Sequence, residues 1–231
     1  MCGRFVQYSL FPEIIREFDI HKVDAELRPS YNIAPTQDVP VVINDGENRL
    51  INCRWGLIPP WSKDPAIGSK MINARAETVA EKPSFKKPFR QSRCLIVTDG
   101  FYEWRKENAR KIPVYIRLKN ARPFGLAGLY SDWKPPEGDT IRTCTIITTE
   151  PNSLLEPIHN RMPVIVHDDA FQLWLDPEVQ DPELLLPLLV PYGSDMMEIH
   201  DVSTRVNSPS NDSPDNIVPV NVNEPVHEPG P

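Results

Sequence analysis

Short runs of β-branched and aliphatic residues, separated by turn-forming residues, recur along most of the chain. Runs with the length and composition of β-strands lie at 39–43, 50–55, 94–98, 113–118, 124–129, 141–148 and 163–166. Asn44-Asp45-Gly46, between the first two runs, is typical of a hairpin turn. Many short strands with few helices predict an α+β fold.

Helical periodicity is limited to short segments. Residues 11–18 place Phe11, Ile14, Ile15 and Phe18 on one helical face, with Pro12 in the first turn. Short helices are also expected at 168–175 and 181–189. The prolines around residues 29–35 and 55–61 instead predict an extended loop and an aromatic, proline-stiffened loop.

Proline is the outlier of the composition, with 26 among 231 residues, about twice the usual share of roughly 5%. Because proline interrupts helices and central strands, this content argues against a helical bundle. From Ser208 onward Pro, Ser, Asn and Asp dominate. We expect one domain over residues 1–220, with 217–220 docked on it, and a disordered proline-rich tail over 221–231.

The net charge of −7 argues at first against a nucleic-acid partner. The charge is unevenly distributed, however. Residues 1–133 carry 21 Lys and Arg against 15 Asp and Glu, whereas residues 134–231 carry 4 against 17. Part of the excess acid lies in the expected tail, so the folded body is more basic than the whole chain suggests.

The cysteines and the absence of long apolar runs indicate the compartment. No stretch approaches the roughly 18 apolar residues of a membrane span, and the N-terminus has no signal-peptide pattern. The cysteines are widely spaced without a C-x-x-C pair, which argues against zinc sites and disulfides: Cys2, Cys53, Cys94 and Cys144. We expect a cytoplasmic monomer without metal or cofactor, in which the last three thiols are buried.

Cys2 differs from the other cysteines because only the initiator methionine precedes it. Loss of Met1 would leave an α-amine and a thiol on one residue, with reference pKa values near 7.7–8.0 and 8.5. Such a 1,2-aminothiol can condense with an aldehyde to an imine and close to a thiazolidine ring. It can also act as an N-terminal nucleophile in acyl transfer. A chance cysteine at this position is the alternative interpretation.

Three further residues are candidates for chemistry. Glu103 lies between Tyr102 and Trp104, where desolvation would raise the pKa of its carboxyl group and suit it to proton transfer. His159 can exchange protons near pH 6.5, and Asn73 can orient a substrate oxygen. The plainer alternatives are a solvated edge-strand Glu103, a surface His159 and an Asn73 that only satisfies a turn.

Basic residues accompany these candidates. Arg4, Arg75 and Arg161 each lie near one of them in the sequence, and arginine binds phosphate in a bidentate manner. Residues 82–93 contain five basic residues and no acid, interleaved with Phe85 and Phe89. This pattern suits single-stranded nucleic acid; the alternative is a solvated loop with both Phe side chains in the core.

Together, the local motifs of the chain resemble the SOS response-associated peptidase (SRAP) family, whose members shield abasic sites in single-stranded DNA. The resemblance extends from Cys2 to about Val220. It is carried by motifs in the expected order: Met1-Cys-Gly-Arg-Phe5, Tyr31-Asn-Ile-Ala-Pro35, Trp55-Gly-Leu-Ile-Pro-Pro-Trp61, Ile72-Asn-Ala-Arg-Ala-Glu77, Gly100-Phe-Tyr-Glu-Trp104, Ile158-His-Asn-Arg-Met-Pro163 and His200-Asp-Val-Ser203 with Val206-Asn207.

The resemblance implies a single compact α+β domain with a barrel-like, mostly antiparallel β core flanked by short helices. It implies that Met1 is removed, by the chain itself in some family members, and that Cys2 forms a thiazolidine with the ring-opened abasic sugar. Asn73 would orient the sugar and the Cys2 amine, Glu103 would act as acid and base, and His159 would assist ring opening.

The resemblance also assigns DNA contacts and a side activity. Arg4, Arg75 and Arg161 would hold phosphates, while Asn32, Pro35, Trp61 and Trp104 would shape the path of the strand. Strand cleavage at abasic sites, a lyase reaction through the imine, would follow from the same amine. Two other functions share these residues: a cysteine peptidase acting on other proteins, and a non-covalent single-strand-binding module.

Overall fold

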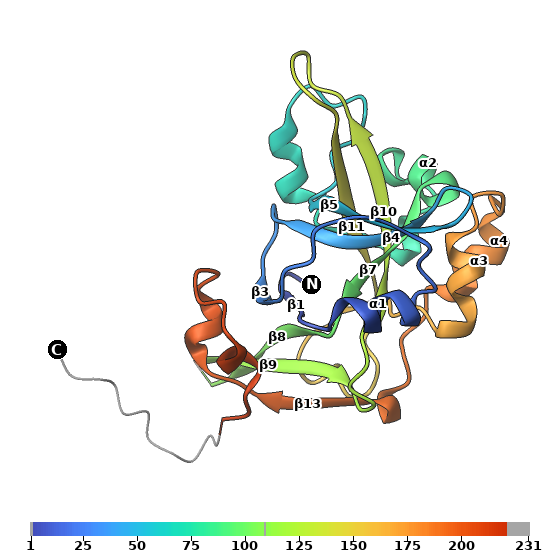
Figure 1. Cartoon of the computed structure of the whole chain (residues 1–231). Helices are drawn as coiled ribbons and strands as arrows, with labels where there is room; N and C mark the ends of the chain where they lie inside the picture. Colours follow the sequence, from blue (N-terminus) through green and yellow to red (C-terminus); the bar gives the residue numbers. More distant parts are fainter. Residues whose placement is uncertain (1, 109, 221–231) are drawn as a thin grey trace.

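The computed structural model describes residues 2–108 and 110–220 (Figure 1). Five strands close into a barrel: β4 (Asp38–Asn44), β5 (Asn48–Trp55), β7 (Arg93–Thr98), β10 (Phe124–Trp133) and β11 (Ile141–Thr149). Neighbours in the order β5-β4-β7-β10-β11 are antiparallel. The ring is closed by a parallel pairing of β11 with β5, in which Cys144 lies opposite Trp55. The predicted barrel-like, mostly antiparallel core is confirmed.

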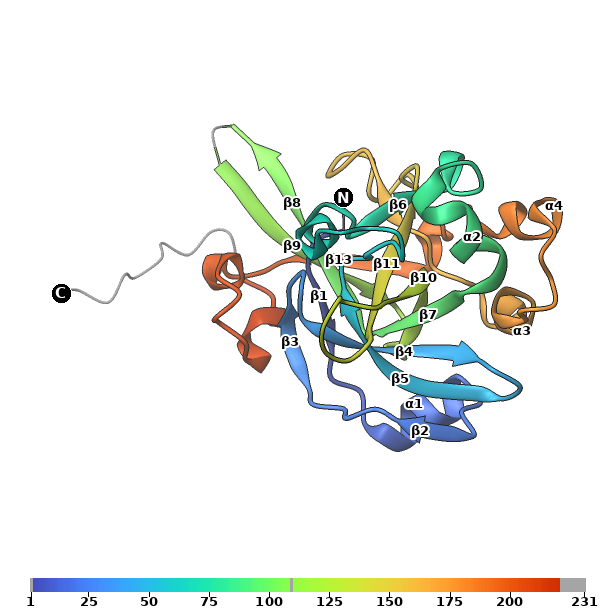
Figure 2. The same cartoon turned by 90° about the horizontal axis from the view of Figure 1, so that it is seen from above.

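A second sheet of five strands lies beside the barrel, as both views show (Figures 1 and 2). Its order is β13 (Met197–Asp201), β9 (Arg110–Leu118), β8 (Gly100–Glu107), β1 (Phe5–Gln7) and β3 (Ser30–Ile33). The expectation of an extended loop at 29–35 was therefore wrong in part. Residues 30–33 have a pairing partner in β1, with Phe5 opposite Ile33.

Short strands extend the barrel sheet at its margins: β2 (Lys22–Asp24) beside β5, and β6 (Asn73–Arg75) and β12 (Met162–Pro163) beside β11. The β6 and β12 pairings meet at one residue, because Thr148 of β11 lies opposite both Arg75 and Pro163. The motifs at 72–77 and 158–163, which are about 85 residues apart in the sequence, are thereby brought together.

The helices are short, as the proline content suggests. They are α1 (Phe11–Glu17), α2 (Pro83–Gln91), α3 (Phe171–Leu175) and α4 (Pro182–Leu185). Turns of 3₁₀ helix are η1 (Pro65–Lys70), η2 (Ala76–Thr78), η3 (Asp168–Ala170), η4 (Leu186–Leu188), η5 (Ser194–Met196), η6 (Thr204–Asn207) and η7 (Pro214–Ile217). None of the helices in the described ranges is both long and apolar enough to span a bilayer.

The hydrophobic core has two main parts, on the two faces of the barrel wall. Along β7, Cys94 and Ile96 belong to the cluster that fills the barrel, whereas Leu95 and Val97 belong to the cluster beneath the helices. This alternation follows from the two-residue period of a strand. Cys53, Cys94 and Cys144 are fully buried free thiols, as predicted.

Two further segments, residues 82–93 and 217–220, pack on the rest of the fold. The basic run, expected to be a binding segment or a loop, is mainly helix α2, with Phe89 buried and Phe85 packed against the outer cluster. Residues 217–220 dock as expected, because Pro219 pairs with Val202 and the Val220 N–H donates to Asp201 O at 2.9 Å. The predicted tail at 221–231 lies outside the described residues.

Candidate active site at the start of the chain

Strand β1 brings the start of the chain against β8. Phe5 lies opposite Phe101 and Val6 opposite Gly100, and the Tyr102 N–H donates to Arg4 O at 2.9 Å. Continued along the chain, this antiparallel register places Glu103 opposite Gly3, next to Cys2. Seen from above, β8 and β6 lie on either side of the first described residues (Figure 2). Cys2 therefore lies between the Glu103 and Asn73 motifs.

The Cys2 side chain is fully buried. Burial raises the pKa of its thiol far above the ordinary value, and the nearby Glu103 carboxylate raises it further. The sequence suggested a thiol that is partly ionised at neutral pH. In the structure the sulfur is instead held in its S–H form, because a thiolate there would be desolvated and next to a carboxylate.

Glu103 is buried, with 4% of its surface exposed. Burial raises the pKa of its carboxyl group to about 7. The carboxyl group thus exists in both protonation states near neutral pH, as a general acid and base requires. The alternative of a solvated edge-strand Glu103 is wrong, because the side chain is buried and β8 lies between β9 and β1 in its sheet.

Asn73, at the start of β6, holds the backbone of Cys2. Its Nδ2 donates to Cys2 O at 2.9 Å, and its position is set by the parallel pairing with Ile146 of β11. Asn73 Oδ1 is buried and accepts no hydrogen bond from any described residue. A buried amide oxygen without a donor is costly, so this atom is available to a substrate hydroxyl group or an amine.

His159 lies in the loop that leads into β12. The Arg161 N–H donates to His159 Nδ1 at 3.0 Å, which leaves the proton of the neutral ring on Nε2. Burial, with positive charges nearby, lowers the pKa of His159 below its ordinary value. The ring is therefore neutral at pH 7 and presents an N–H donor at Nε2.

Arg161 is fixed by a two-pronged ion pair with Glu77. Its Nη1 and Nη2 lie 2.7 and 3.0 Å from the two Glu77 carboxylate oxygens, and Nη2 also donates to Thr148 O. This contact lowers the pKa of Glu77. Glu77 belongs to a motif noted in the sequence, but its partner could not be inferred. Only the shared pairing of β6 and β12 with β11 brings the two residues together.

Arg75 follows Asn73 on β6 and points to the surface. Its side chain makes no hydrogen bond or ion pair with another residue in the described part of the chain. Arg75 and Arg161 thus differ in the structure. The guanidinium group of Arg75 is free for a phosphate, whereas that of Arg161 is already paired with a carboxylate.

Arg4, half-buried, belongs to a network on the other side of Cys2. Its Nη1 donates to Asn32 Oδ1 at 2.6 Å and to Val206 O at 2.8 Å, and its guanidinium group lies 5.9 Å from the Trp104 ring centre. The Trp104 Nε1–H donates to Asn207 Oδ1 at 2.8 Å. These contacts hold Arg4 and Trp104 in place at the rim of the cleft.

Asn32 has a different environment from the one predicted. It is 1% exposed, and its Nδ2 donates to the backbone carbonyl groups of Val206, Ser208 and Asn211. In this structure it offers no surface to DNA; it fastens the C-terminal segment and orients Arg4. Val206 and Asn207 belong to a motif noted in the sequence, but Ser208 and Asn211 were missed because they accept through backbone carbonyl groups, which leave no side-chain signal.

Pro35 lies between β3 and β4, and Trp61 lies in the loop after β5. The Trp55 Nε1–H donates to Ile72 O and the Leu57 N–H to Met71 O, so the loop that carries Trp61 runs beside the approach to Asn73. Gly56 permits this path, because its φ is +131° and a Cβ there would lie 2.7 Å from Gly68 O. Trp61 is 62% exposed, and Pro35 is half-buried.

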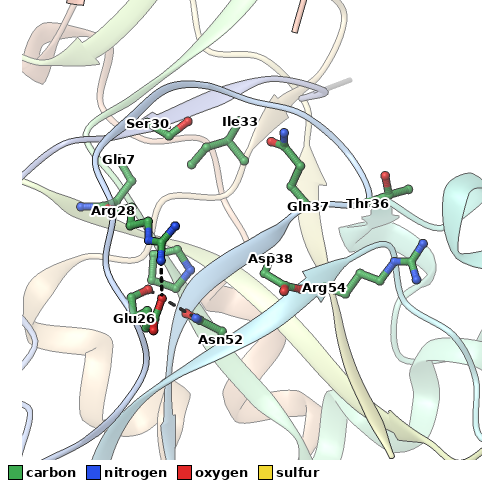
Figure 3. Close-up of a pocket in the computed structure, with 11 residues that line it drawn as sticks. Gln7, Glu26, Arg28, Ser30, Ile33, Thr36, Gln37, Asp38, Asn52 and Arg54 are labelled. Atoms are coloured by element: carbon green, nitrogen blue, oxygen red, sulfur yellow. Dashed lines mark hydrogen bonds and ion pairs between the residues drawn. The ribbon is translucent and has the colours of Figure 1, made fainter. Parts of the chain in front are cut away.

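A hollow on the described surface lies elsewhere, beside β3, β4 and β5 (Figure 3). It has a volume of about 660 Å³, and its lining carries charges of both signs: Glu26, Arg28, Asp38 and Arg54. Arg28 is paired with Glu26 at 3.1 Å. None of the residues predicted for the active site lines this hollow. Within residues 2–108 and 110–220 no group of three or more His, Cys, Asp or Glu side chains could hold a metal ion.

Comparisons with known proteins agree with this geometry. The sequence model described as SOS response associated peptidase (SRAP) matches residues 1–209. The abasic site processing protein YoqW of Bacillus subtilis is 54% identical over 219 residues, which cover 93% of this chain and 98% of that protein. The abasic site processing protein HMCES of Gallus gallus is 32% identical over 247 residues, covering 93% of this chain and 71% of that protein.

Solved structures show the same fold. A crystal structure of a protein from Bacteroides thetaiotaomicron superposes with a TM-score of 0.85 at 29% identity, covering 95% of this chain and all of that one. A crystal structure from Bordetella bronchiseptica gives a TM-score of 0.76 at 25% identity, covering 87% of this chain and all of that one. The chain therefore belongs to the SOS response-associated peptidase (SRAP) family.

Proposed function

We propose that this protein processes abasic sites in single-stranded DNA by capturing the ring-opened sugar as a thiazolidine on Cys2. The observation that carries the proposal is the arrangement around Cys2. Asn73 holds its backbone at 2.9 Å, and the buried Glu103, with a pKa of about 7, lies close enough to raise the pKa of its thiol. The relatives named as abasic site processing proteins support the same substrate.

Met1 must leave before the chemistry can begin, because only a terminal Cys2 carries an amine and a thiol on adjacent carbons. The proposal includes removal of Met1 by the chain itself. Hydrolysis of the Met1–Cys2 peptide bond consumes one water molecule and frees the Cys2 amine, with Cys2 as the N-terminal nucleophile. This self-processing is the peptidase activity that the proposal assigns to the protein.

The order of bond formation follows from the protonation states. Because the Cys2 thiol is held as S–H, the amine is the first nucleophile. It adds to the C1′ aldehyde of the abasic sugar and forms an imine with loss of water. The sulfur then bonds to C1′, and the thiol proton passes to the nitrogen. Glu103 accepts and returns this proton, which its pKa near neutrality permits.

The surrounding residues supply the substrate and hold it in place. The Nε2–H of the neutral His159 can donate to the ring oxygen of the closed sugar and assist its opening. Asn73 Oδ1 can accept from a sugar hydroxyl group or the Cys2 amine. Arg4, Arg75 and Arg161 would bind the flanking phosphates, with Trp61 and Trp104 beside the strand. Diversion of the imine to β-elimination would give the lyase side reaction.

The reaction needs a reduced Cys2 and a single copy of each site residue. The protein is thus expected to act in the reducing cytoplasm, as a monomer and without a metal or cofactor. Neither proteolysis of other proteins nor non-covalent strand coating is favoured by a specific feature of the site. Both remain outcomes of the test below.

The test is incubation of the purified protein with a single-stranded oligonucleotide that contains one abasic site. A denaturing gel should show a DNA–protein adduct, and mass spectrometry should show a chain that begins at Cys2. A borohydride-treated Cys2→Ala sample serves as the control. Without the Cys2 nucleophile this variant keeps Met1, whose amine can form only an imine; the reductant traps that imine, and no adduct should survive without reductant. Absence of an adduct with the wild-type protein would refute the proposal.

A further inference from the structure

The basic run 82–93 forms a charged row on one side of α2. Lys82, Lys86 and Arg90 are exposed and lie four residues apart, with Lys87 exposed beside them. Positions four apart lie on one face of a helix, so these side chains project together. Arg93, the remaining basic residue of the run, is buried and donates to backbone carbonyl groups, including Phe89 O and Arg90 O.

The described structure gives Lys86 and Lys87 no stabilising partner. Lys86, Lys87 and Arg90 form no ion pair with a described residue, and the first turn of α2 contains no acid. The helix dipole favours Arg90, which lies in the last turn of α2, but not Lys86 and Lys87 in the middle of the helix. Folding therefore explains Arg93 but not Lys86 and Lys87.

The aromatic residues of the run do not reach the surface. Phe89 is fully buried and stacks at a tilt against Trp174, and Phe85 packs into the outer core cluster. Single-strand-binding surfaces combine cations with exposed rings on which bases stack. The exposed side of α2 offers charge without rings. It matches a phosphate backbone rather than unstacked bases.

The position of α2 connects this row to the active site. Strand β6 carries Asn73 and Arg75, and the chain passes through η2 directly into α2. Helix α2 packs against β7 and β10, and in the view from above it lies in the same half of the molecule as β6 (Figure 2). The row of Lys86, Lys87 and Arg90 thus follows Arg75 closely in the chain, on the first α-helix after β6 and η2.

We infer that the exposed row of α2, formed by Lys86, Lys87 and Arg90, binds the phosphate backbone of DNA flanking the lesion. This inference rests on the proposed function, which places the lesion at Cys2. It adds a non-covalent contact, insensitive to base sequence, that extends the bound DNA beyond the cleft. The phosphates could belong to the continuing single strand or to an adjoining duplex, since both present the same chemistry.

The test measures the salt dependence of binding to intact, fluorescently labelled DNA with no abasic site. The K86Q/K87Q/R90Q variant removes the row and keeps good helix-forming residues. The slope of log K against log salt should fall in magnitude by about 2–3, because each lost phosphate contact changes it by about 1. Affinity at about 0.1 M salt should fall by roughly tenfold or more.

A matched control removes the same charge elsewhere. The R16Q/K22Q/R28Q variant replaces exposed cations around α1 and β2, and its slope should equal that of the wild-type protein. A single strand and a strand with a duplex arm, compared in parallel, show which form supplies the phosphates. An unchanged slope for K86Q/K87Q/R90Q, or an equal change in both variants, would overturn the inference.

A separate readout keeps the inference distinct from the proposed function. With an abasic oligonucleotide of about five nucleotides, which fills only the cleft, K86Q/K87Q/R90Q should form the Cys2 adduct at the wild-type rate. Loss of the adduct in the wild-type protein would refute the capture at Cys2. A normal adduct with an unaltered salt slope would refute only the role of α2.

Discussion

Two buried carboxylates, Asp99 and Glu103, lie four residues apart at the two ends of one short segment of chain. Each is 4% exposed, and burial raises the pKa of both. Asp99 accepts hydrogen bonds from the Tyr8 N–H, the Ser9 N–H and the Ser9 hydroxyl group, which offset part of that rise. Glu103 lies beside the Cys2 thiol and reaches a pKa of about 7.

The difference shows that burial alone does not identify a catalytic acid. Asp99 is committed to fixing the chain where β1 ends, and its donors belong to the backbone and to one hydroxyl group. Glu103 instead lies near the Cys2 thiol. The thiols repeat the contrast: Cys2 and Cys144 are equally buried and belong to the same core cluster, but Cys2 lies near Glu103, whereas Cys144 contacts Cys53.

The largest effect is expected from the two cysteines. Cys2→Ala should abolish the borohydride-independent DNA adduct, because ring closure needs the thiol. Cys144→Ala should leave the adduct yield unchanged and lower the free energy of unfolding by roughly 1–2 kcal/mol, through a small core cavity. Denaturing gels and urea unfolding curves measure the two effects. Loss of the adduct in Cys144→Ala would show that the two buried cysteines do not differ in this way.

Substitutions of the two carboxylates are expected to change different quantities: the rate of adduct formation for Glu103 and the free energy of unfolding for Asp99. Glu103→Gln should slow adduct formation by roughly 10²–10⁴-fold, the usual contribution of a general acid or base, without loss of the folded structure. Asp99→Asn should leave the adduct rate within about threefold and lower the free energy of unfolding by roughly 1–3 kcal/mol, because its donors lose a charged acceptor. Single-turnover kinetics and thermal melts measure both. Similar rates for the two variants would remove the distinction.

The free energy of unfolding should depend on pH, because ionisation of the buried Glu103 carboxyl group is costly in the folded state. Its folded-state pKa is raised from 4.5 to about 7, so its contribution to stability is complete below about pH 4.5 and is lost as the pH rises through 7. At pH 8 Glu103→Gln should therefore gain roughly 3 kcal/mol over the wild-type protein, relative to their difference at pH 4. Urea unfolding at both pH values measures this gain. The same difference at both values would contradict it.

A smaller effect is expected at Glu77, which holds Arg161. Glu77→Gln should slow adduct formation about three- to tenfold, because Arg161 also supplies the N–H that fixes the His159 ring. The pH profile of the rate should shift along with it, a change that simple destabilisation would not cause. Glu183→Gln, at an exposed acid on α4, is the matched control. An unchanged profile in Glu77→Gln would show that Arg161 needs no carboxylate partner.

The strands and the motif residues could be predicted from the sequence, but their pairing could not. The apolar run at 94–98 and the turn at 44–46 are local signals, and both correspond to elements of the barrel. The parallel closure of β11 on β5 leaves no such signal, because it joins residues about 90 positions apart. Helix α2 was missed since Pro83 and Pro88 weaken its helical pattern.

The site was predictable to a similar degree. Asn73 and Glu103 stood out because polar residues interrupt apolar surroundings, and the structure places both around Cys2. Asn32 was placed at the DNA surface, although its partners are backbone carbonyl groups of residues 206–211. Such partners are chosen by tertiary packing, and the sequence carries no mark of them.

The hydrogen bond from Arg4 to Val206 has a consequence for how the protein is made. It joins residues 202 positions apart, so the cleft cannot assume its final form until nearly the whole chain has left the ribosome. Loops of this length close late in folding, and synthesis proceeds at about 5–20 residues per second. A nascent chain would expose Cys2 for roughly 10–40 seconds without the complete set of groups that direct its chemistry, and the capture site would mature only when synthesis is nearly complete.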